Sequence, residues 1–323
     1  MQIYKFNNIF KPVLWGGNKL MAFKGLPQQD QPIGESWELS AMPGRESIVA
    51  QGDDSGMTLP QLIERYGADL VGKDVFHRYG NQFPLLIKLI DARRDLSIQV
   101  HPDNDMAQRL HGCLGKNEMW YVLEADGGAK IRTGFNRGLT VEEFDRRLSD
   151  GSILDVINAT DSQPGDTFYI PAGQIHAIGA GNLIVEIQQS CDITYRVWDY
   201  NRRDTDGNLR ELHVEKAREA LDFAPRYDQV LDKPCIAPGV IGLMDSKDFV
   251  VRLLTVDEHY TLELPSPDSF VAMVCIEGGA TLCVAGMPHV TVSRGETVLV
   301  PAIADRVEMA GTARVLLVSV PAS

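Results

Sequence analysis

Short apolar segments separated by turns dominate the pattern of hydrophobic and polar positions along the chain. Examples are PLLIKLIDA at residues 84–92, EMWYVLEA at 118–125 and LIVEIQQ at 183–189. Runs of this length, rich in branched and aromatic residues and bounded by turn formers, are typical of strands. The pattern therefore predicts a mainly β protein built from barrels or sandwiches.

Four segments instead carry the signals of helices. Thr58 and Pro60 open the first, because a threonine caps a helix and a proline is tolerated in its first turn. Thr140 and Glu143 form a capping-box pattern in front of another. The predicted helices cover residues 58–70, 104–111, 140–150 and 213–221. We interpret them as packing elements and assign them no chemistry.

An internal repeat indicates two related halves. GDTFYIPAGQIHAI at residues 165–178 aligns with GETVLVPAIADRVEM at 295–309, since both run Gly, an acidic residue, Thr, three residues and Pro. The repeat predicts two barrels of common ancestry. Arg306 occupies the position of His176 in this alignment, so the second barrel is expected to bind no metal. A proline-rich junction at 225–238 then separates a first domain of residues 1–232 from a second of 233–323.

The charge balance limits the classes of partner. The 323 residues are 44% hydrophobic and 23% charged, as in ordinary globular proteins, and their net charge is −13. Nucleic-acid binding depends on clustered Lys and Arg, so a nucleic-acid partner is not expected. An anionic substrate needs a local basic cluster that acts against the average field of the protein. The sequence leaves the oligomeric state open.

The cysteines and the N-terminal segment favour the cytoplasm. Cysteines 113, 191, 235, 275 and 283 have no CxxC pattern and no regular spacing, so we expect reduced thiols. MQIYKFNNIFKP lacks the pattern of a signal peptide, and no apolar run approaches the ~20 residues of a membrane helix. We therefore expect a soluble cytoplasmic protein without a membrane partner.

Four residues with metal-binding side chains form an ordered set. Gln99 and His101 are two apart in LSIQVHP, so a strand projects both to one face. Glu118 leads the run EMWYVLEA, and the turn in IPAGQIH lets a strand bend back and present His176. Taken singly, each residue has a commoner structural or solvated role. Together they predict one divalent metal with a coordination position left free, as catalytic sites have.

The sequence around these residues resembles a known family. Gly-x5-Pro-x-Gly-x2-His at 165–176 is the second signature of cupins, small β-barrels with a metal inside. The first cupin signature reads His-x-His followed closely by Glu, whereas Gln99 stands in the first His position here and Glu118 lies 17 residues beyond His101. With this departure, QVHPDN, KNEMWYV, IPAGQIHAI and DITYRVWDYNR resemble the type I phosphomannose isomerases in their short bacterial form. FKPVLWGGNKL, GESWELS and FPLLIKLIDA extend the resemblance over essentially the whole chain.

The resemblance implies two cupin-like β-barrels, or jelly rolls, with a few short helices. It also implies a zinc-dependent interconversion of mannose 6-phosphate and fructose 6-phosphate through an enediolate, in which a Lewis acid stabilises the developing negative charge. His101, Glu118 and His176 are the predicted ligands, and Gln99 is a weaker fourth because its amide is neutral. This ligand set suits zinc but also manganese, iron, cobalt or nickel. The resemblance favours one zinc ion per chain.

Three residues are candidates for catalysis. The arginine of the family motif matched by ITYR is considered catalytic, so the resemblance assigns to Arg196 the stabilisation of the oxyanion or the guidance of the oxygen-bound proton. Lys116 precedes Glu118 by two positions and is expected on its face, where it binds phosphate or, with a pKa lowered by burial, acts as an acid and base. Glu186, a charged residue in the apolar run LIVEIQQ, is the candidate base for the carbon-bound proton.

Two further residues are candidates for substrate binding. Lys88 lies within the apolar run LLIKLI, where an unpaired charge is unfavourable, so we expect a partner or a site near the metal. Ser36 of GESWELS is placed near the sugar phosphate by the resemblance. Arg202 and Arg203 are other available cations, and we interpret at least one of them as a solvated loop residue.

Two alternative functions share the predicted fold. A cupin oxygenase acting on a small metabolite needs a richer histidine set than Gln99 allows. A non-catalytic sugar-binding cupin, such as a regulator, predicts ligand binding that survives the loss of Arg196. The sequence contains no DNA-binding helix pair and no basic stripe that favours a regulator.

Overall fold

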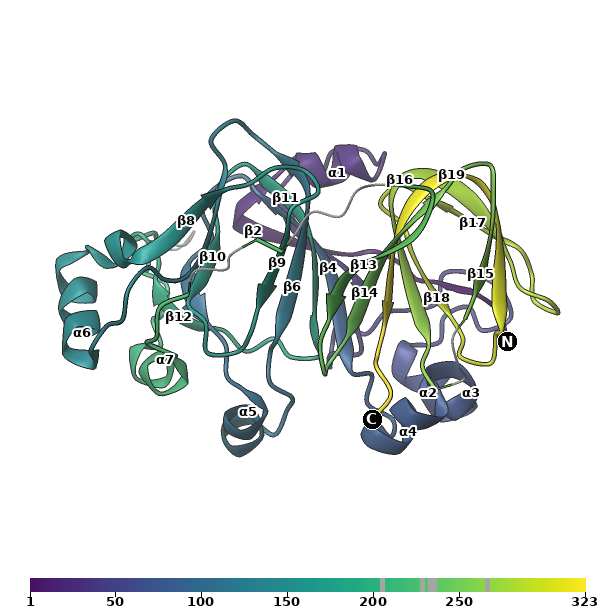
Figure 1. The fold of residues 1–323 in the computed structure, drawn as a ribbon, viewed down its shortest axis with the longest axis horizontal. Helices are drawn as coiled ribbons and strands as arrows, with labels where there is room; N and C mark the ends of the chain where they lie inside the picture. The colour runs from purple at the N-terminus through teal and green to yellow at the C-terminus, as the bar shows by residue number, and fades with distance from the viewer. Residues whose placement is uncertain (204–206, 227–229, 232–236, 265–267) are drawn as a thin grey trace.

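The computed structural model describes residues 1–203, 207–226, 230–231, 237–264 and 268–323 (Figure 1). The predicted junction at 225–238 lies largely outside the described residues, as does Cys235. The chain is mainly β, as predicted, and the described strands form three sheets.

A six-stranded sheet occupies the middle of the molecule (Figure 1). Its strands pair antiparallel, as between β4 and β11, whose residues are buried on both faces. In spatial order they are β2 (Ile9–Gly17), β3 (Ile33–Leu39), β4 (Leu85–Ala92), β11 (Asn182–Gln189), β6 (Glu118–Ala125) and β9 (Thr167–Ile170).

A five-stranded sheet faces one side of this central sheet. The two sheets share a core in which Trp120 and Ile184 of the central sheet meet Ile131 and Ile178 of the smaller one. The order of the smaller sheet is β12 (Tyr195–Trp198), β5 (Ile98–Val100), β10 (His176–Ile178), β7 (Lys130–Phe135) and β8 (Ile157–Asp161).

An eight-stranded sheet covers the opposite side of the central sheet. Alternate residues of β4 and β11, such as Leu89 and Ile187, pack in one core with Leu253 and Leu316 of this sheet. Its path is β1 (Tyr4–Lys5), β18 (Thr297–Val300), β16 (Val271–Cys283), β19 (Arg306–Ser319), β14 (Val250–Val256) and β13 (Gly239–Asp245), with β15 (His259–Glu263) on β19 and β17 (Val290–Ser293) on β16.

Two features of the strand pairing bear on the predicted two-barrel architecture. The first strand, β1, pairs with β18 and so joins the start of the chain to the C-terminal sheet. The pairing path of each sheet has two ends, so the described strands close no barrel and the prediction of two cupin-like β-barrels is not confirmed.

The helices largely follow their predicted boundaries. Thr58 caps α2 (Leu59–Tyr66) through a capping box with Gln61, but α2 ends at Tyr66 and Gly67 separates it from α3 (Ala68–Val71), so the single helix predicted to residue 70 is wrong. Gly112 and Gly151 end α5 and α6 in the left-handed conformation that glycine favours. The described helices are α1 (Lys19–Phe23), α2 (Leu59–Tyr66), α3 (Ala68–Val71), α4 (Lys73–Tyr79), α5 (Asn104–His111), α6 (Val141–Asp150), α7 (Val214–Ala220) and a 3-10 turn (Ile153–Val156). None of them is long and apolar enough to cross a bilayer.

The shared core predicts that the two halves unfold together. Leu253 is buried in the core between the central and C-terminal sheets, so Leu253→Ala should lower the free energy of unfolding by about 2–5 kcal/mol. All four tryptophans precede residue 199, so tryptophan fluorescence reports on the first half. We expect the fluorescence and circular-dichroism transitions in urea to move together. Ile303→Ala, at a side chain 55% exposed, should move neither. A shifted circular-dichroism transition with an unchanged fluorescence midpoint would contradict the shared core.

Candidate metal and active site

The side chains of His101, Glu118 and His176 converge between the central sheet and the five-stranded sheet, as predicted. His101 follows β5, His176 opens β10 beside it, and Glu118 opens β6 in the facing sheet. Their ligand atoms all lie within 4.8 Å of one another, and the three side chains are buried. The Nε2 atoms of the two histidines are 3.1 Å apart, and Glu118 Oε1 lies 3.3 Å from His101 Nε2.

Both imidazoles are oriented by backbone carbonyls. His101 Nδ1 lies 2.9 Å from Ile193 O, and His176 Nδ1 lies 2.8 Å from Gln174 O. A carbonyl only accepts, so each Nδ1 carries the proton and each Nε2 presents a lone pair when the ring is neutral. Burial lowers the pKa of His101 and lowers that of His176 to about 3, so both rings are neutral near pH 7.

Glu118 completes an electron-rich group. Burial alone raises the pKa of its carboxyl, but the neighbouring Lys116 ammonium and the histidines outweigh burial and lower the pKa well below its ordinary value. Neither carboxylate oxygen accepts a hydrogen bond from a described residue, although Lys116 Nζ forms an ion pair with Oε1 at 2.9 Å. Two lone pairs and a carboxylate thus face one another in the buried interior. This donor set fits a divalent metal ion, and neutral imidazole and carboxylate are zinc ligands.

Gln99 contacts the same group through its amide. Its strand β5 pairs with β10 in the register Gln99 to His176, and Gln99 Nε2 lies 3.3 Å from His176 Nε2. The amide nitrogen therefore faces the lone pair of His176. Rotation of the amide by about 180° presents the oxygen in its place.

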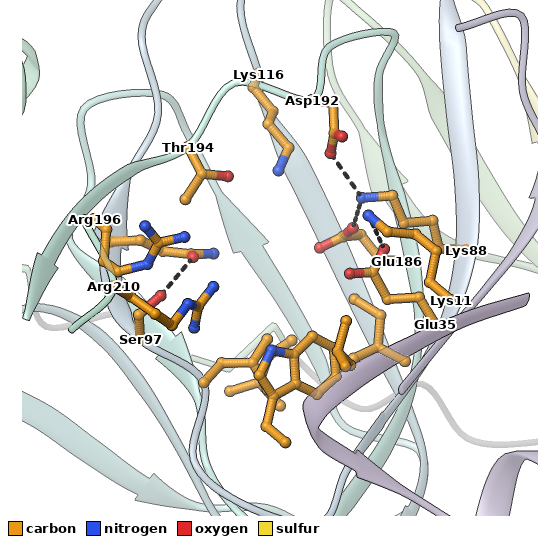
Figure 2. A pocket seen from close by; sticks show the side chains of 16 residues that line it. Lys11, Glu35, Lys88, Ser97, Lys116, Glu186, Asp192, Thr194, Arg196 and Arg210 are labelled. Atoms are coloured by element: carbon orange, nitrogen blue, oxygen red, sulfur yellow. Dashed lines mark hydrogen bonds and ion pairs between the residues drawn. The ribbon is translucent and has the colours of Figure 1, made fainter. Parts of the chain in front are cut away.

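A cavity of about 310 Å³ adjoins this group. Arg196, Arg210 and Ser97 lie at one end of it, and Lys88, Lys11, Glu35 and Glu186 at the other (Figure 2). The lining consists of Lys11, Val13, Trp15, Glu35, Lys88, Ile90, Leu96, Ser97, Gln99, Lys116, Ile178, Glu186, Asp192, Thr194, Arg196 and Arg210.

Lys88 and Glu186 form a buried ion pair on neighbouring strands. They are directly paired in the register of β4 and β11, and Lys88 Nζ lies 3.1 Å from Glu186 Oε2. The expected partner for Lys88 is thereby found. Trp120 Nε1 donates to Glu186 Oε1 at 3.1 Å. Burial and the charge of Glu118 raise the pKa of Glu186. Burial acts to lower the pKa of Lys88, but the neighbouring carboxylates outweigh burial and raise it.

Lys116 lies beside the metal-site residues, as predicted from its spacing. Its Nζ is 2.9 Å from Glu118 Oε1 and 3.3 Å from His101 Nε2. Burial acts to lower its pKa, but the carboxylate of Glu118 outweighs burial and raises it. The lowered pKa that the acid-and-base alternative for Lys116 requires is therefore not found, and the raised pKa favours a protonated donor.

Arg196 extends from β12, which pairs with β5 at Gln99. Its Nη1 donates to Glu211 O at 2.7 Å, and its Nε has no partner among the described residues. Arg202 pairs with Asp199, and Arg203 donates to Gly207 O. Neither Arg202 nor Arg203 is among the described cavity-lining residues, in line with a loop role.

Ser36 is not brought together with the other candidates. Strand β3 alternates its faces, so Glu35 lines the cavity while Ser36 points to the other side. There Ser36 Oγ donates to Glu38 Oε1 at 2.6 Å, and Glu38 forms a buried ion pair with Lys24. The string GESWELS marks the correct strand, but the residue that lines the cavity is its glutamate.

Sequence reasoning missed Lys11, Glu35, Asp192 and Arg210. Lys11 and Glu35 pair at 3.3 Å, and both belong to strings that carry the family resemblance. Asp192 lies 3.9 Å from Lys88, and its position one residue after Cys191 in a loop gives no periodic signal. Arg210 also lies in a loop, 14 residues beyond Arg196, so its approach to the cavity depends on tertiary structure.

The sheet architecture and buried donor set define a β-sheet protein with a candidate metal site beside a charged cavity. Residues 3–126 match the model of the phosphomannose isomerase type I catalytic domain, and residues 241–320 match that of the mannose-6-phosphate isomerase cupin domain.

Relatives agree over most of the chain. The probable mannose-6-phosphate isomerase GmuF of Bacillus subtilis is 42% identical over 69% of this chain and 69% of its own. A mannose-6-phosphate isomerase of Streptococcus mutans is 33% identical over 89% of each chain. The crystal structure of the mannose 6-phosphate isomerase from Bacillus subtilis superposes with a TM-score of 0.87 at 31% identity, covering 98% of this chain and 99% of that one.

The chain therefore belongs to the type I phosphomannose isomerase family. This membership does not support the alternatives of an oxygenase or a non-catalytic sugar-binding protein.

Metal binding should depend on the three converging side chains. We expect about one divalent metal per chain in the purified protein, and His101→Ala and His176→Ala should each weaken metal affinity by more than about 100-fold because each removes a ligand. Elemental analysis and competition with a chromophoric chelator measure this. His213→Ala, at a histidine outside the group, is the control. Full metal content in both ligand variants would contradict the site.

The buried histidines also predict how pH acts on the metal-free protein. The unfolded chain binds protons at histidine near pH 6.5, whereas folded His176 does so only near its pKa of about 3. The contribution of neutral His176 to the free energy of unfolding is therefore fully present above about pH 6.5 and is lost as the pH is lowered. Between pH 6.5 and pH 5 this loss amounts to about 2 kcal/mol. Urea titrations of metal-free protein measure this. His176→Gln should flatten the dependence, and exposed His289→Gln should not. An unchanged dependence in His176→Gln would contradict the buried neutral ring.

Proposed function

We propose that the chain is a metal-dependent mannose-6-phosphate isomerase, which interconverts mannose 6-phosphate and fructose 6-phosphate. The observation that carries the proposal is the convergence of two neutral imidazoles and an ionised carboxylate beside a cavity with five basic side chains. Because the net charge of the chain is −13, five basic side chains at one cavity are a local cluster and do not reflect a generally basic protein.

His101, Glu118 and His176 are the proposed metal ligands, with Gln99 as the weaker fourth. A divalent ion bound there supplies Lewis-acid stabilisation of the negative charge that develops on the sugar oxygens. The nitrogen and oxygen donors and the family favour zinc.

The anionic end of the substrate is assigned to the arginines. Lys11 and Lys88 at the other end already pair with Glu35 and Glu186, whereas Arg196 contacts only a backbone carbonyl among the described partners of its side chain. Arg196 is therefore the first candidate to bind the phosphate or the developing oxyanion, and Arg210, whose Nη1 lies 3.4 Å from Asp199 Oδ1, is the second. As a fixed cation, Arg196 stabilises charge and orients the oxygen-bound proton without acting as a base.

Proton transfer is assigned to the carboxyl and ammonium groups. Glu186, with a pKa raised by burial and by Glu118, is suited to accept and return the carbon-bound proton near neutral pH. Lys116, held protonated by Glu118, donates a hydrogen bond or a proton to a sugar oxygen. Lys88 orients Glu186 through their ion pair and contacts a sugar hydroxyl.

The two-domain division and the two cupin-like barrels are also part of the proposal. The cupin model matches residues 241–320, and β9 and β18 occupy equivalent places in the internal repeat. Arg306 opens β19 as His176 opens β10, which supports the alignment and a metal-free second half of residues 233–323. A cytoplasmic setting agrees with cysteines 113, 191, 275 and 283, which are free thiols.

The activity should depend on metal and on Arg196. In a coupled assay, fructose 6-phosphate should form from mannose 6-phosphate, stop after chelation and return with zinc. Arg196→Ala should bind metal normally yet lose about 100-fold or more in kcat, because it removes a charge that stabilises the transition state. Arg203→Ala, outside the described cavity lining, is the matched control. No product formation with metal restored would contradict the proposed function.

A further inference from the structure

Asp248 of the C-terminal half forms a buried contact with the segment that holds the site. It lies in the turn between β13 and β14 and is buried. One carboxylate oxygen accepts a hydrogen bond from Asn117 Nδ2 at 2.6 Å, and the other accepts one from Gln189 Nε2 at 3.1 Å. Asn117 lies directly between Lys116 and Glu118.

These bonds fix the direction of both amides. Because an ionised carboxylate only accepts, the NH₂ groups of Asn117 and Gln189 must face Asp248. Their oxygens then face backbone donors: Asn117 Oδ1 accepts from Ala172 N at 2.7 Å, and Gln189 Oε1 accepts from Asn117 N at 3.0 Å. The remaining hydrogen of Gln189 Nε2 is directed to Asn104 Oδ1 at 3.1 Å.

The network connects the chain segments that carry the proposed ligands. Asn117 fixes the start of β6, where Glu118 lies, and Ala172 belongs to the turn that leads to His176. Gln189 precedes the loop in which Ile193 O orients His101. One side-chain amide and a short backbone segment therefore connect Asp248 to each of the three proposed ligands.

We propose that Asp248 is a positioning residue for the metal site, through which the C-terminal half sets the geometry of the ligands. The inference rests on the proposed metal site and extends it to a part of the chain that contributes no ligand. It assigns the second half a role in the site beyond stability.

An isosteric exchange tests the direction of the hydrogen bonds. Asp248→Asn keeps the shape but places an NH₂ group against the NH₂ of Asn117 or Gln189, so one amide must turn and lose its backbone donor. We expect metal affinity and kcat to fall by about 10–100-fold. The d–d absorption spectrum of the cobalt(II) protein, which reports ligand geometry without turnover, should change.

The reciprocal exchange should restore the network. In Asn117→Asp with Asp248→Asn, residue 248 donates to residue 117 and still accepts from Gln189, while residue 117 still accepts from Ala172 N. The cobalt spectrum and zinc affinity should return to within about 3-fold of the original. The control is Asp54→Asn, because Asp54 is a buried carboxylate that accepts from Tyr4 and Tyr66 away from the cavity. Asp54→Asn should lower thermal stability and leave the spectrum unchanged.

The outcomes separate positioning from stability. A changed cobalt spectrum in Asp248→Asn that the reciprocal variant reverses supports the inference. An unchanged spectrum and affinity with only a lower melting temperature, as in Asp54→Asn, overturns it. If Asp248→Asn does not fold, the cobalt spectrum of the folded reciprocal variant is the test. A spectrum that differs from that of the unaltered protein overturns the inference. Absence of isomerase activity in the unaltered protein would count against the proposed function alone, because the spectrum and affinity are measured without substrate.

Discussion

The rest of the site depends on three electron-rich side chains that the fold buries close together. Backbone carbonyls fix the rings of His101 and His176 so that their Nε2 atoms, which carry the lone pairs, lie 3.1 Å apart. The carboxylate of Glu118 faces both rings. Such groups repel one another in a medium of low polarity unless a cation lies among them. The ammonium of Lys116, 2.9 Å from Glu118 Oε1 and 3.3 Å from His101 Nε2, compensates part of this repulsion, and a divalent ion held by the three side chains would compensate it further.

The layered fold buries this group and places a charged cavity beside it. The middle strands β4 and β11 of the central sheet are buried on both faces because the five-stranded sheet covers one face and the C-terminal sheet the other. Alternation along β4 and β11 turns Leu89 and Ile187 to the C-terminal half and Lys88 and Glu186 to the cavity. The same strands thus join the halves and carry charged residues of the site.

Much of this arrangement could be predicted from the sequence, and the failures have physical causes. The period of two in LSIQVHP and the turn in IPAGQIH predict where Gln99, His101 and His176 point, because strand alternation is local. Ser36 lies on the expected strand but on the face away from the cavity, because a resemblance identifies a string and alternation decides which of its residues faces the cavity. Arg210 and Asp248 reach the site through loops and a distant hairpin, contacts that no local pattern encodes. The direction of the pKa shift at Lys116 depended on Glu118 lying 2.9 Å away, which burial alone does not predict.

X-ray absorption at the zinc edge of the purified protein tests the central claim most directly, because it reports the atoms bound to the metal. The account predicts nitrogen and oxygen ligands at about 2.0–2.2 Å, with the multiple-scattering signature of two imidazoles and no sulfur. Sulfur at about 2.3 Å, or a spectrum without imidazole scattering, would show that the metal is bound elsewhere and would contradict the account.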